Sequence, residues 1–573
     1  MTNYHFSYKN ASTQYVDIAV TIPAGGLNVL SVQLPAWRPG RYELGNFAKN
    51  VKGFRIEDEQ GKPVAFEKIT KDCWEVETHG LENIIVKYSY YANQLNAGST
   101  WLDNNQLYVN PVNCCVYAAG MENYPCRVEI DVPRNYKLAC GEKHTEEFSD
   151  TGVKLAFETE DFDRLADTPF IASVTMKHDT YEEAGTLFHL WFVGECKPGF
   201  EKIKADFKAF TAKQIAVMGS IPVKEYHFYF QILPTPFHHG VEHLTSTVIG
   251  LGPSYKLMMG EVYEDFLGVS SHELFHVWNI KTIRPAEMLP YDFTGENYFT
   301  TGFVAEGVTT YYGDTFLLRS KVFNNDTYFA LLADTIKRHN HNYARHNYSV
   351  AASGFDTWLD GYVPGAPQRK VSIYNEGCLL AFALDVQIRK HSNNQHSLDD
   401  VMRRLYEDFG LKNRGYLADD YKTLAEVAAG VNFDDFFADY IFGTKPYNDL
   451  LNESLAYLGL ELIETPSGQY GERVFGFKTD GGKVASIAPH SPAEKAGLTI
   501  GDTLVAVNGF TGSFNDWFNY FASETVKLTV NNGGVLKDIY LHPCNEQYYP
   551  TYSIKMLENA TAEQKAAFES WSN

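Results

Sequence analysis

Hydrophobic and polar positions alternate in short runs through the first part of the chain. Residues 15–22 (YVDIAVTI) and 82–88 (ENIIVKY) are two examples, rich in β-branched residues at a two-residue period. Glycine and proline pairs such as Gly25-Gly26 and Pro39-Gly40 separate the runs, as turns do. Short strands at this spacing predict an N-terminal β sandwich over residues 1–165.

The pattern then changes to mixed and finally to helical spacing. Strands are expected at 188–193 and 226–231, with a helix at 200–218 between them. Apolar residues at helical spacing dominate from about 255 to 445. This part is therefore predicted to be a mostly helical domain over residues 166–455. The longest helices expected in it span 263–280, 302–318 and 374–389.

Glycine-rich, strand-bearing sequence follows, and residues 487–509 (IAPHSPAEKAGLTIGDTLVAVNG) strongly resemble a PDZ domain. A short helix, a glycine turn, a strand and an Asn-Gly hairpin are expected there in that order. The PDZ domain is predicted at 456–545. Upstream, Phe475, Gly476 and Phe477 resemble the loop whose backbone N–H groups hold a peptide carboxylate. A tail at 546–573 is predicted to contain a short helix, because Thr561 and Gln564 fit a capping box.

Composition and charge narrow the classes of partner. The chain has 573 residues, 44% of them hydrophobic, and a formal net charge of −22. These values fit a globular protein and argue against nucleic acid and anionic membrane surfaces as partners. Eight scattered cysteines without a CxxC pair, together with the absence of a signal-like start, predict a cytoplasmic protein with reduced, mostly buried thiols.

The strongest chemical signal is His272-Glu273-Leu274-Phe275-His276. On a helix, two histidines four residues apart share one face and can converge on one zinc ion, with Glu273 beside them. A catalytic zinc needs a third protein ligand and one open position. Glu306, near the start of the next apolar helical run, is favoured for that ligand. Asp292, Glu296 and Asp314 remain alternatives.

A wider set of residues around this motif resembles the glycyl aminopeptidase family. The resemblance rests on residues 272–279 (HELFHVWN), Lys281 with Ile283-Arg284-Pro285, residues 305–307 (AEG) with 311–314 (YYGD), and residues 34–42 (LPAWRPGRY). That family consists of gluzincin-type zinc peptidases. The resemblance covers essentially the whole chain and implies a thermolysin-like peptidase domain.

The resemblance also implies roles for single residues. His272, His276 and Glu306 match the ligands of one Zn²⁺ per chain, and Glu273 matches the general base that activates a zinc-bound water. In the substrate-binding segment Gly240, Glu242 and His243, Glu242 takes the role of gripping the free α-amino group. Tyr374 matches the tyrosine that steadies the oxyanion. Two positions depart from the family pattern, namely Glu376 where lysine is usual and His239 where a second glycine is common.

These observations predict a zinc aminopeptidase that acts on peptides with a free N-terminus and prefers Gly and Ala there. An endopeptidase on the same zinc site is an alternative. Another alternative is an interaction protein in which the PDZ domain docks a C-terminal peptide and the peptidase site is vestigial. His339, His341 and His346 are expected in a solvated polar loop rather than at a metal.

Overall fold

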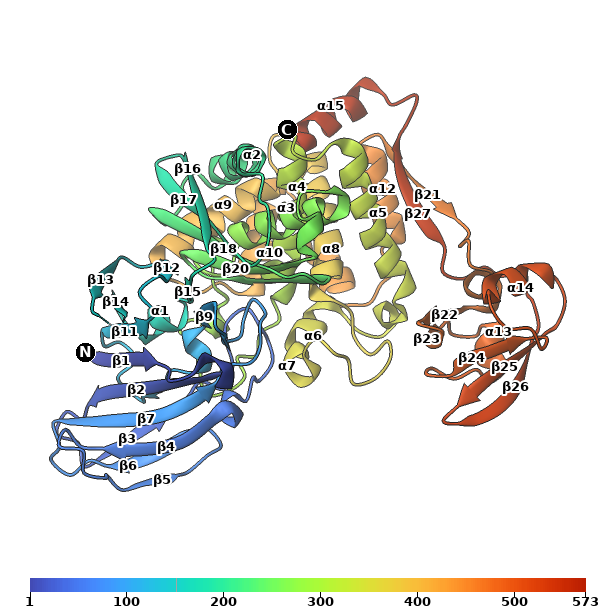
Figure 1. The fold of residues 1–573 in the computed structure, drawn as a ribbon. Helices are drawn as coiled ribbons and strands as arrows, with labels where there is room; N and C mark the ends of the chain where they lie inside the picture. The colour runs from blue at the N-terminus through green and yellow to red at the C-terminus, as the bar shows by residue number, and fades with distance from the viewer. Residues whose placement is uncertain (151) are drawn as a thin grey trace.

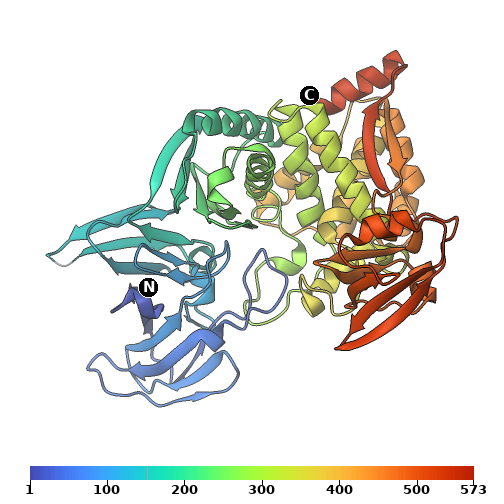
Figure 2. The same ribbon diagram turned by 45° about the vertical axis from the view of Figure 1, so that its right-hand side comes forward.

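Three parts follow one another along the chain in the computed structural model, which describes residues 1–150 and 152–573. A region of mostly antiparallel strands leads into a mixed sheet covered by helices, and a small β module lies near the C-terminus. Figures 1 and 2 show the helical part between the N-terminal strands and the small β module. The predicted multidomain α+β architecture is confirmed. No helix of the described chain is long and apolar enough to cross a membrane.

The N-terminal region contains two facing sheets, one of seven strands and one of four. Strands β2 (Tyr15–Pro23) and β7 (Asn83–Tyr91) bury every second residue, as the alternating sequence predicts. Phe54 from the larger sheet stacks at 4.0 Å on Trp74 from the smaller one. The other strands of these sheets are β1 (Thr2–Ser7), β3 (Val29–Gln33), β4 (Val51–Glu57), β5 (Phe66–Lys68), β6 (Cys73–Glu77), β10 (Tyr117–Ala118), β11 (Cys126–Val132), β13 (His144–Phe148) and β14 (Val153–Thr159).

A third small sheet links this region to the centre of the molecule. It has the order β12-β15-β9-β8. Tyr108, Ala139 and Ile171 from this sheet form one buried cluster with Tyr229 and Val248 from the central sheet. Its strands are β8 (Trp101–Leu102), β9 (Gln106–Val109), β12 (Lys137–Cys140) and β15 (Phe170–Ser173), and the short helix α1 (Phe162–Ala166) precedes β15. The N-terminal strand pairing therefore continues to residue 173.

The central sheet has the order β16-β17-β18-β20-β19, so β19 forms one edge. Strands β17, β18 and β20 are parallel, whereas β16 and β19 are antiparallel to their neighbours. Helix α2 (Phe200–Met218) makes the crossover between β17 and β18 at the predicted residues. The strands are β16 (Lys177–Glu183), β17 (Thr186–Val193), β18 (Glu225–Ile232), β19 (Phe237–Glu242) and β20 (Ser246–Gly252).

The helical part differs from the predicted elements in two places. Helix α3 (Gly260–Phe275) ends five residues before the predicted end at 280. The run predicted as one helix at 302–318 consists of a π-helical turn, Phe303–Val308, followed by α4 (Thr309–Arg319). The remaining helices of this part are α5 (Asn325–His341), α6 (Val350–Phe355), α7 (Thr357–Asp360), α8 (Ile373–His391), α9 (Leu398–Asp408), α10 (Ala418–Ala429), α11 (Asp434–Phe436) and α12 (Asn448–Tyr457).

The C-terminal module is a five-stranded sheet, β22-β23-β24-β25-β26, with two short helices and its own hydrophobic core. The chain enters and leaves it through a two-stranded ribbon, β21 (Leu460–Thr465) with β27 (Thr551–Met556). The tail thus contains a strand as well as the predicted helix. The elements are β22 (Phe477–Asp480), β23 (Lys483–Ile487), α13 (Pro492–Lys495), β24 (Thr503–Val507), α14 (Phe514–Tyr520), β25 (Val526–Asn532) and β26 (Val535–Leu541).

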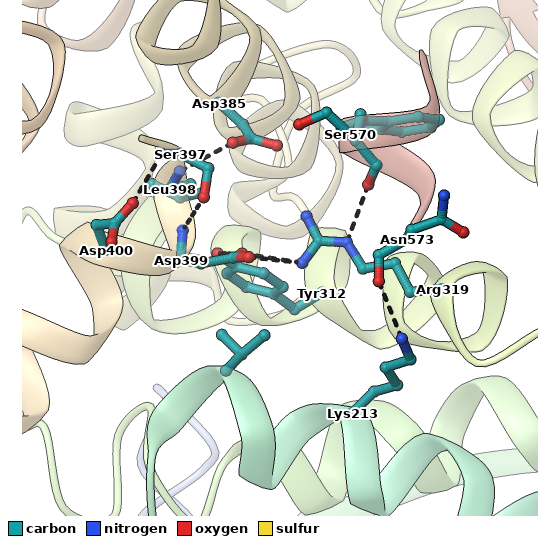
Figure 3. Close-up of polar contacts among 12 residues, drawn as sticks. Lys213, Tyr312, Arg319, Asp385, Ser397, Leu398, Asp399, Asp400, Ser570 and Asn573 are labelled. Carbon is teal, nitrogen blue, oxygen red and sulfur yellow. Dashed lines mark hydrogen bonds and ion pairs between the residues drawn. The ribbon is translucent and has the colours of Figure 1, made fainter. Parts of the chain in front are cut away.

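The last helix, α15 (Ala562–Ser572), returns to the helical part and opens with the predicted capping box at Thr561. Cationic side chains from three other helices donate hydrogen bonds to its final turn. Arg389 bonds the Ser570 carbonyl at 3.0 Å, and Lys213 bonds the Asn573 carbonyl at 3.0 Å; Arg319 lies in the same group (Figure 3). Positive charge at a helix C-terminus is favourable, so these contacts fix the tail on the helical part.

Candidate metal centre and peptide-binding cleft

The metal-binding motif lies where α3 ends. His272 and Glu273 are in the last turn of α3, and His276 is the residue that caps it. Glu306 is in the π-helical turn before α4. Helix α4 packs closely on α3 because Gly313 has no side chain: a Cβ there would lie 3.1 Å from the His272 Cβ.

The geometry of His272, His276 and Glu306 fits a zinc site. The two Nε2 atoms are 3.0 Å apart, and Glu306 Oε2 lies 3.4 Å from Nε2 of His276 and 3.8 Å from Nε2 of His272. Zinc with bonds near 2.05 Å in a tetrahedron separates its ligands by about 3.3 Å. The imidazole planes are inclined at 83°, so both lone pairs can be directed to one point.

A second group of three potential ligands, His189, Glu225 and His227, does not have this property. The rings of His189 and His227 are stacked at 4.2 Å with only 1° between their planes. A metal ion must lie close to the plane of each imidazole that binds it, and parallel stacked planes do not intersect. Of the two histidine pairs, only His272 and His276 are therefore arranged to hold an ion.

Surrounding contacts orient the imidazole of His276. Its Nδ1 lies 2.7 Å from the Asn279 carbonyl, and because a carbonyl only accepts, Nδ1 carries a proton and Nε2 is the nitrogen that faces the other two candidate ligands, where a metal would replace a proton. The Asn279 side chain bonds the Val304 carbonyl at 2.8 Å, which ties this loop to the turn that carries Glu306.

Charge at the centre also favours a cation. Burial would lower the pKa of His276, but the carboxylates of Glu306 and Glu242 raise it to about 10. Burial would raise the pKa of Glu306, yet the two histidines hold it well below its usual range. The site therefore stabilises positive charge between these groups, as a zinc site must.

Glu273 lies beside the metal-binding residues with one oxygen unsatisfied. Its side chain is buried, and its Oε2 has no hydrogen-bond partner within the described part of the chain. Burial first, and then Glu242 and Glu306, raise its pKa. Strand β19 passes directly over it at Gly240, where a Cβ would lie 2.0 Å from Glu273 Oε1. Gly240 therefore makes room for the carboxylate of Glu273.

Glu242 ends strand β19 and points into the same cleft. It is only 5% exposed, and among the described residues its carboxylate forms no hydrogen bond or ion pair. One of its oxygens lies within 4.8 Å of ligand atoms of Glu273 and His276. Arg38 and His276 interact electrostatically with this carboxylate but form no hydrogen bond or ion pair with it, so its oxygens remain available to accept hydrogen bonds from a cationic ligand.

His243 follows Glu242 but faces the other way, because successive strand residues point to opposite faces. Its Nδ1 lies 3.0 Å from Asp167 Oδ1, and Lys281 Nζ lies 2.8 Å from the same oxygen. This buried cluster is outside the cleft lining. The structure therefore gives no geometric support for a contact between His243 and substrate. The His243 side chain instead packs in a buried polar cluster with Asp167 and Lys281.

Tyr374 lies in the first turn of α8 and lines the cleft. Its ring centroid is 6.4 Å from that of His272, and its hydroxyl is 3.4 Å from that of Tyr362. Burial raises the pKa of Tyr374, so the phenol keeps its proton and can donate it in a hydrogen bond.

The cleft itself is a cavity of about 1010 Å³. It brings together most of the predicted residues, namely Gly240, Glu242, His272, Glu273, His276, Glu306 and Tyr374. Of the alternative third ligands, Asp292 accepts bonds from Thr294, Glu296 is exposed, and Asp314 lines the cleft outside the ligand group.

The two departures from the family pattern have different environments. Glu376 is buried and accepts hydrogen bonds from Nδ1 of His339 at 2.6 Å and from the Tyr447 hydroxyl. His339 and His341 are in α5, so the polar loop predicted for them is wrong. His239 lines the cleft, and burial together with Arg38 and Arg41 lowers its pKa to about 3, so it is neutral at physiological pH.

Three residues that contact the candidate site were not predicted as functional, and of these Gly40 lines the cleft. Gly40, Tyr42 and Tyr362 contact Glu242, Glu306 and Tyr374, respectively. Gly40 and Tyr42 belong to segment 34–42, which resembles the family. Because this segment is far in sequence from the zinc motif, its contacts with Glu242 and Glu306 could not be predicted from spacing.

The predicted carboxylate loop of the PDZ module is closely packed. Phe475, Gly476 and Phe477 are all buried, and the Gly476 N–H donates to the Glu472 carbonyl at 3.1 Å. A Cβ on Gly476 would lie 2.4 Å from Ser491 Cβ. Peptide binding at this loop stays a prediction, and it would require the Gly476 amide to exchange its partner.

Comparisons with known proteins identify families for three segments of the chain. The profile of the Peptidase M61 N-terminal domain matches residues 3–174, that of the M61 glycyl aminopeptidase matches 265–380, and that of a PDZ domain matches 483–530. Among curated proteins, no sequence matches significantly.

One solved structure shows the same fold over the whole chain, and a second is more distantly similar. An aminopeptidase N family protein from Idiomarina loihiensis superposes with a TM-score of 0.90 at 24% identity over 100% of both chains. An M1 zinc metallopeptidase from Deinococcus radiodurans gives a TM-score of 0.47 at 14% identity, over 75% of this chain and 90% of that one. The chain therefore belongs to the M61 glycyl aminopeptidase family, a family of metallopeptidases, and carries a PDZ domain.

Proposed function

We propose that the protein binds one zinc ion per chain and removes small N-terminal residues, Gly and Ala, from peptides. The observation that carries the proposal is the buried carboxylate of Glu242, which accepts no hydrogen bond among the described residues and lies close to Glu273 and His276. The ammonium group of a peptide N-terminus would satisfy it with charge-assisted hydrogen bonds. An acid at a fixed distance from the metal centre restricts cleavage to the first peptide bond.

His272, His276 and Glu306 would hold the zinc ion. When bound, zinc supplies Lewis-acid polarisation of the scissile carbonyl. Glu273 accepts a proton from the attacking water and returns it to the leaving amine, a role supported by its free Oε2 and raised pKa. The neutral phenol of Tyr374 donates a hydrogen bond to the oxyanion that develops at the carbonyl.

The preference for small residues rests on the family and on the walls around Glu242. Gly40 lies so close that a Cβ there would be 2.4 Å from Glu242 Oε2. His239 and Gly240 also line this end of the cleft. We expect kcat/KM for Gly- and Ala-anilides to exceed the values for Leu- and Phe-anilides. Equal values would contradict the preference while leaving the aminopeptidase proposal intact.

Replacement of Glu242 tests the amine contact. Glu242→Gln removes the charge but keeps the shape, and charged hydrogen bonds contribute about 1.5–3 kcal/mol, or roughly 10–150-fold. We expect kcat/KM for Gly- and Ala-anilides to fall by that factor. Glu182→Gln, an exposed acid on β16, is the matched control and should behave as wild type. Unchanged hydrolysis in Glu242→Gln, or cleavage of N-blocked peptides only, would favour an endopeptidase.

A further inference from the structure

One loop of the N-terminal region reaches the metal centre from the far end of the sequence. Residues 37–43 place Gly40 against Glu242, and the Tyr42 hydroxyl donates to Glu306. Arg41 lies 5.3 Å above the Tyr362 ring, and the Tyr362 hydroxyl contacts that of Tyr374. The same loop therefore touches, directly or through one residue, the amine-binding acid, a metal-binding acid and the oxyanion tyrosine.

The loop is held in place by contacts with the helical part. The Trp37 indole N–H donates to the Asp292 carbonyl at 2.6 Å, and the Ala36 N–H donates to the Phe293 carbonyl at 2.8 Å. The Trp37 ring packs edge-on against Tyr291 and Trp358 at 5.6 and 5.0 Å. Trp37 and Tyr42 are completely buried. The position of the Tyr42 hydroxyl is therefore set by the docking of the two regions.

The two oxygens of Glu306 have different surroundings. Oε1 accepts the Tyr42 hydroxyl at 2.7 Å, whereas Oε2 faces the Nε2 atoms of His276 and His272 at 3.4 and 3.8 Å. A hydrogen bond from a phenol occupies a lone pair of Oε1 and draws negative charge from it. Oε2 is then the oxygen that remains available to a metal.

Ligation through one oxygen matters for a catalytic site. A catalytic zinc has three protein ligands and a fourth position that stays open to water or substrate. If both oxygens of Glu306 bound the metal, the additional bond would crowd that position. Outer contacts of this kind usually change metal affinity by about 10–100-fold when removed.

We propose that Tyr42 is a positioning residue of the metal centre, which holds Glu306 so that only Oε2 serves as a ligand. The inference rests on the proposed role of Glu306 as a zinc ligand. Tyr42 does not reach the substrate; it acts through Glu306. Because Tyr42 comes from the N-terminal region, zinc affinity depends on the docking of that region against the helices.

The test is the zinc affinity of full-length Tyr42→Phe, measured by competition with a chromophoric chelator. We expect a dissociation constant about 10–100-fold above wild type, and an altered visible spectrum of the cobalt(II)-substituted protein. Tyr4→Phe is the matched control: Tyr4 is buried in the same region and donates to the Val116 carbonyl at 3.0 Å, away from the cleft. It should keep wild-type zinc affinity and the wild-type cobalt spectrum.

Two results would overturn the proposal. One is a Tyr42→Phe zinc affinity within twofold of both wild type and Tyr4→Phe, with an unchanged cobalt spectrum. If Tyr42→Phe does not fold, Trp37→Phe is used instead, because that substitution removes the hydrogen bond to the Asp292 carbonyl but keeps an aromatic ring. The second result that would overturn the proposal is a zinc affinity of Trp37→Phe equal to that of wild type. Failure of the wild type to bind zinc would instead contradict the proposed function itself.

Discussion

Two glycines allow the backbone to approach the carboxylates of the cleft. A Cβ at Gly240 would lie 2.0 Å from Glu273 Oε1, and a Cβ at Gly40 would lie 2.4 Å from Glu242 Oε2. Gly40 also has a φ of +83°, a conformation that residues with side chains rarely adopt. A side chain at either position would therefore displace the neighbouring carboxylate, Glu273 beside Gly240 and Glu242 beside Gly40.

Gly240→Ala should displace Glu273 without touching a metal ligand. A misplacement of about 1 Å at a reacting group can reduce kcat by about 100-fold. We expect a loss of this size in anilide hydrolysis with a normal zinc content by metal analysis. Gly295→Ala is the control, because no atom lies within 4 Å of the Cβ it would add. A kcat near wild type for Gly240→Ala would show that Glu273 is free to move.

Glu273→Gln tests the general base directly. Positioned acid–base groups contribute about 10²–10⁴-fold to the rate, so kcat should fall within that range. Zinc content should remain at one per chain, since Glu273 is outside the group of His272, His276 and Glu306. Retention of more than a tenth of the wild-type kcat would exclude Glu273 as the base.

Short-range spacing predicted the histidine motif, but it could not predict the contacts that complete the centre. His272, Glu273 and His276 are close in sequence, so helix geometry alone places them together. Tyr42 and Glu306 are 264 residues apart, and only the folded chain brings the Tyr42 hydroxyl to Oε1. Glu306 itself was favoured over three other acids, and the structure places it with the two imidazoles.

Among the secondary-structure elements, the predictions failed where helices change form. Helix α2 was predicted at its observed residues, but α3 ends at Phe275 because the chain turns back and the Lys281 N–H bonds the His276 carbonyl. The turn at 303–308 is π-helical, and apolar spacing does not distinguish it from an α-helix. That turn carries Glu306, so the irregular element is also the one that holds the proposed third ligand.

The stacked histidines of β16, β17 and β18 predict acid sensitivity of the central sheet. Burial, and then the neighbouring imidazoles, lower the pKa of His227, and burial followed by His189 lowers that of His178 to about 4. An unfolded histidine binds a proton near pH 6.5. Between these pH values the unfolded chain holds more protons on these histidines than the folded chain does. The free energy of unfolding should therefore fall as pH falls from about 6.5 toward 4.

Urea unfolding of wild type and His178→Phe at pH 7.5, 6 and 5 measures this effect. Phenylalanine keeps the ring over Trp191, which His178 stacks on at 3.6 Å, but cannot titrate. We expect the variant to lose less stability on acidification than wild type. Identical losses in the two proteins would mean that His178 does not contribute to the acid response.

At the scale of the whole molecule, the net charge of −22 is partly concentrated in the cleft. Four acids that form no hydrogen bond or ion pair among the described residues line it beyond the metal centre, and Arg338 is a cation among them. Burial raises the pKa of Asp314 to about 7, so this group is only partly ionised at neutral pH. The four are Glu261, Glu264, Asp265 and Asp314. Three of them lie on α3 and one on α4, and all four line the cleft.

Peptides with Lys or Arg after the first residue should therefore bind in a salt-dependent way. From about 0.01 M to about 0.15 M salt, the Debye length falls from about 30 Å to about 8 Å. We expect KM for Ala-Lys peptides to rise several-fold over this range, while KM for Ala-Gln peptides stays nearly constant. Asp265→Asn should reduce the difference, and equal salt dependence of the two peptides would contradict the assignment.

The assembly of the regions could not be predicted from local patterns. The three parts were recognisable from strand periods, helical spacing and the PDZ-like segment. Their docking depends on single buried contacts such as Trp37 with Asp292 and Arg389 with Ser570, which join distant residues. The periodicity of apolar residues does not predict such contacts, although the contact of Trp37 with Asp292 positions one wall of the cleft.

Mass spectrometry of a peptide that begins Gly-Ala, offered with a free and with an acetylated N-terminus, tests most directly whether the protein is a zinc-dependent aminopeptidase. We expect stepwise loss of residues from the free N-terminus only, abolished by a chelator and restored by one equivalent of zinc. Internal cleavage, equal hydrolysis of the acetylated peptide, or activity that survives complete removal of metal would contradict it.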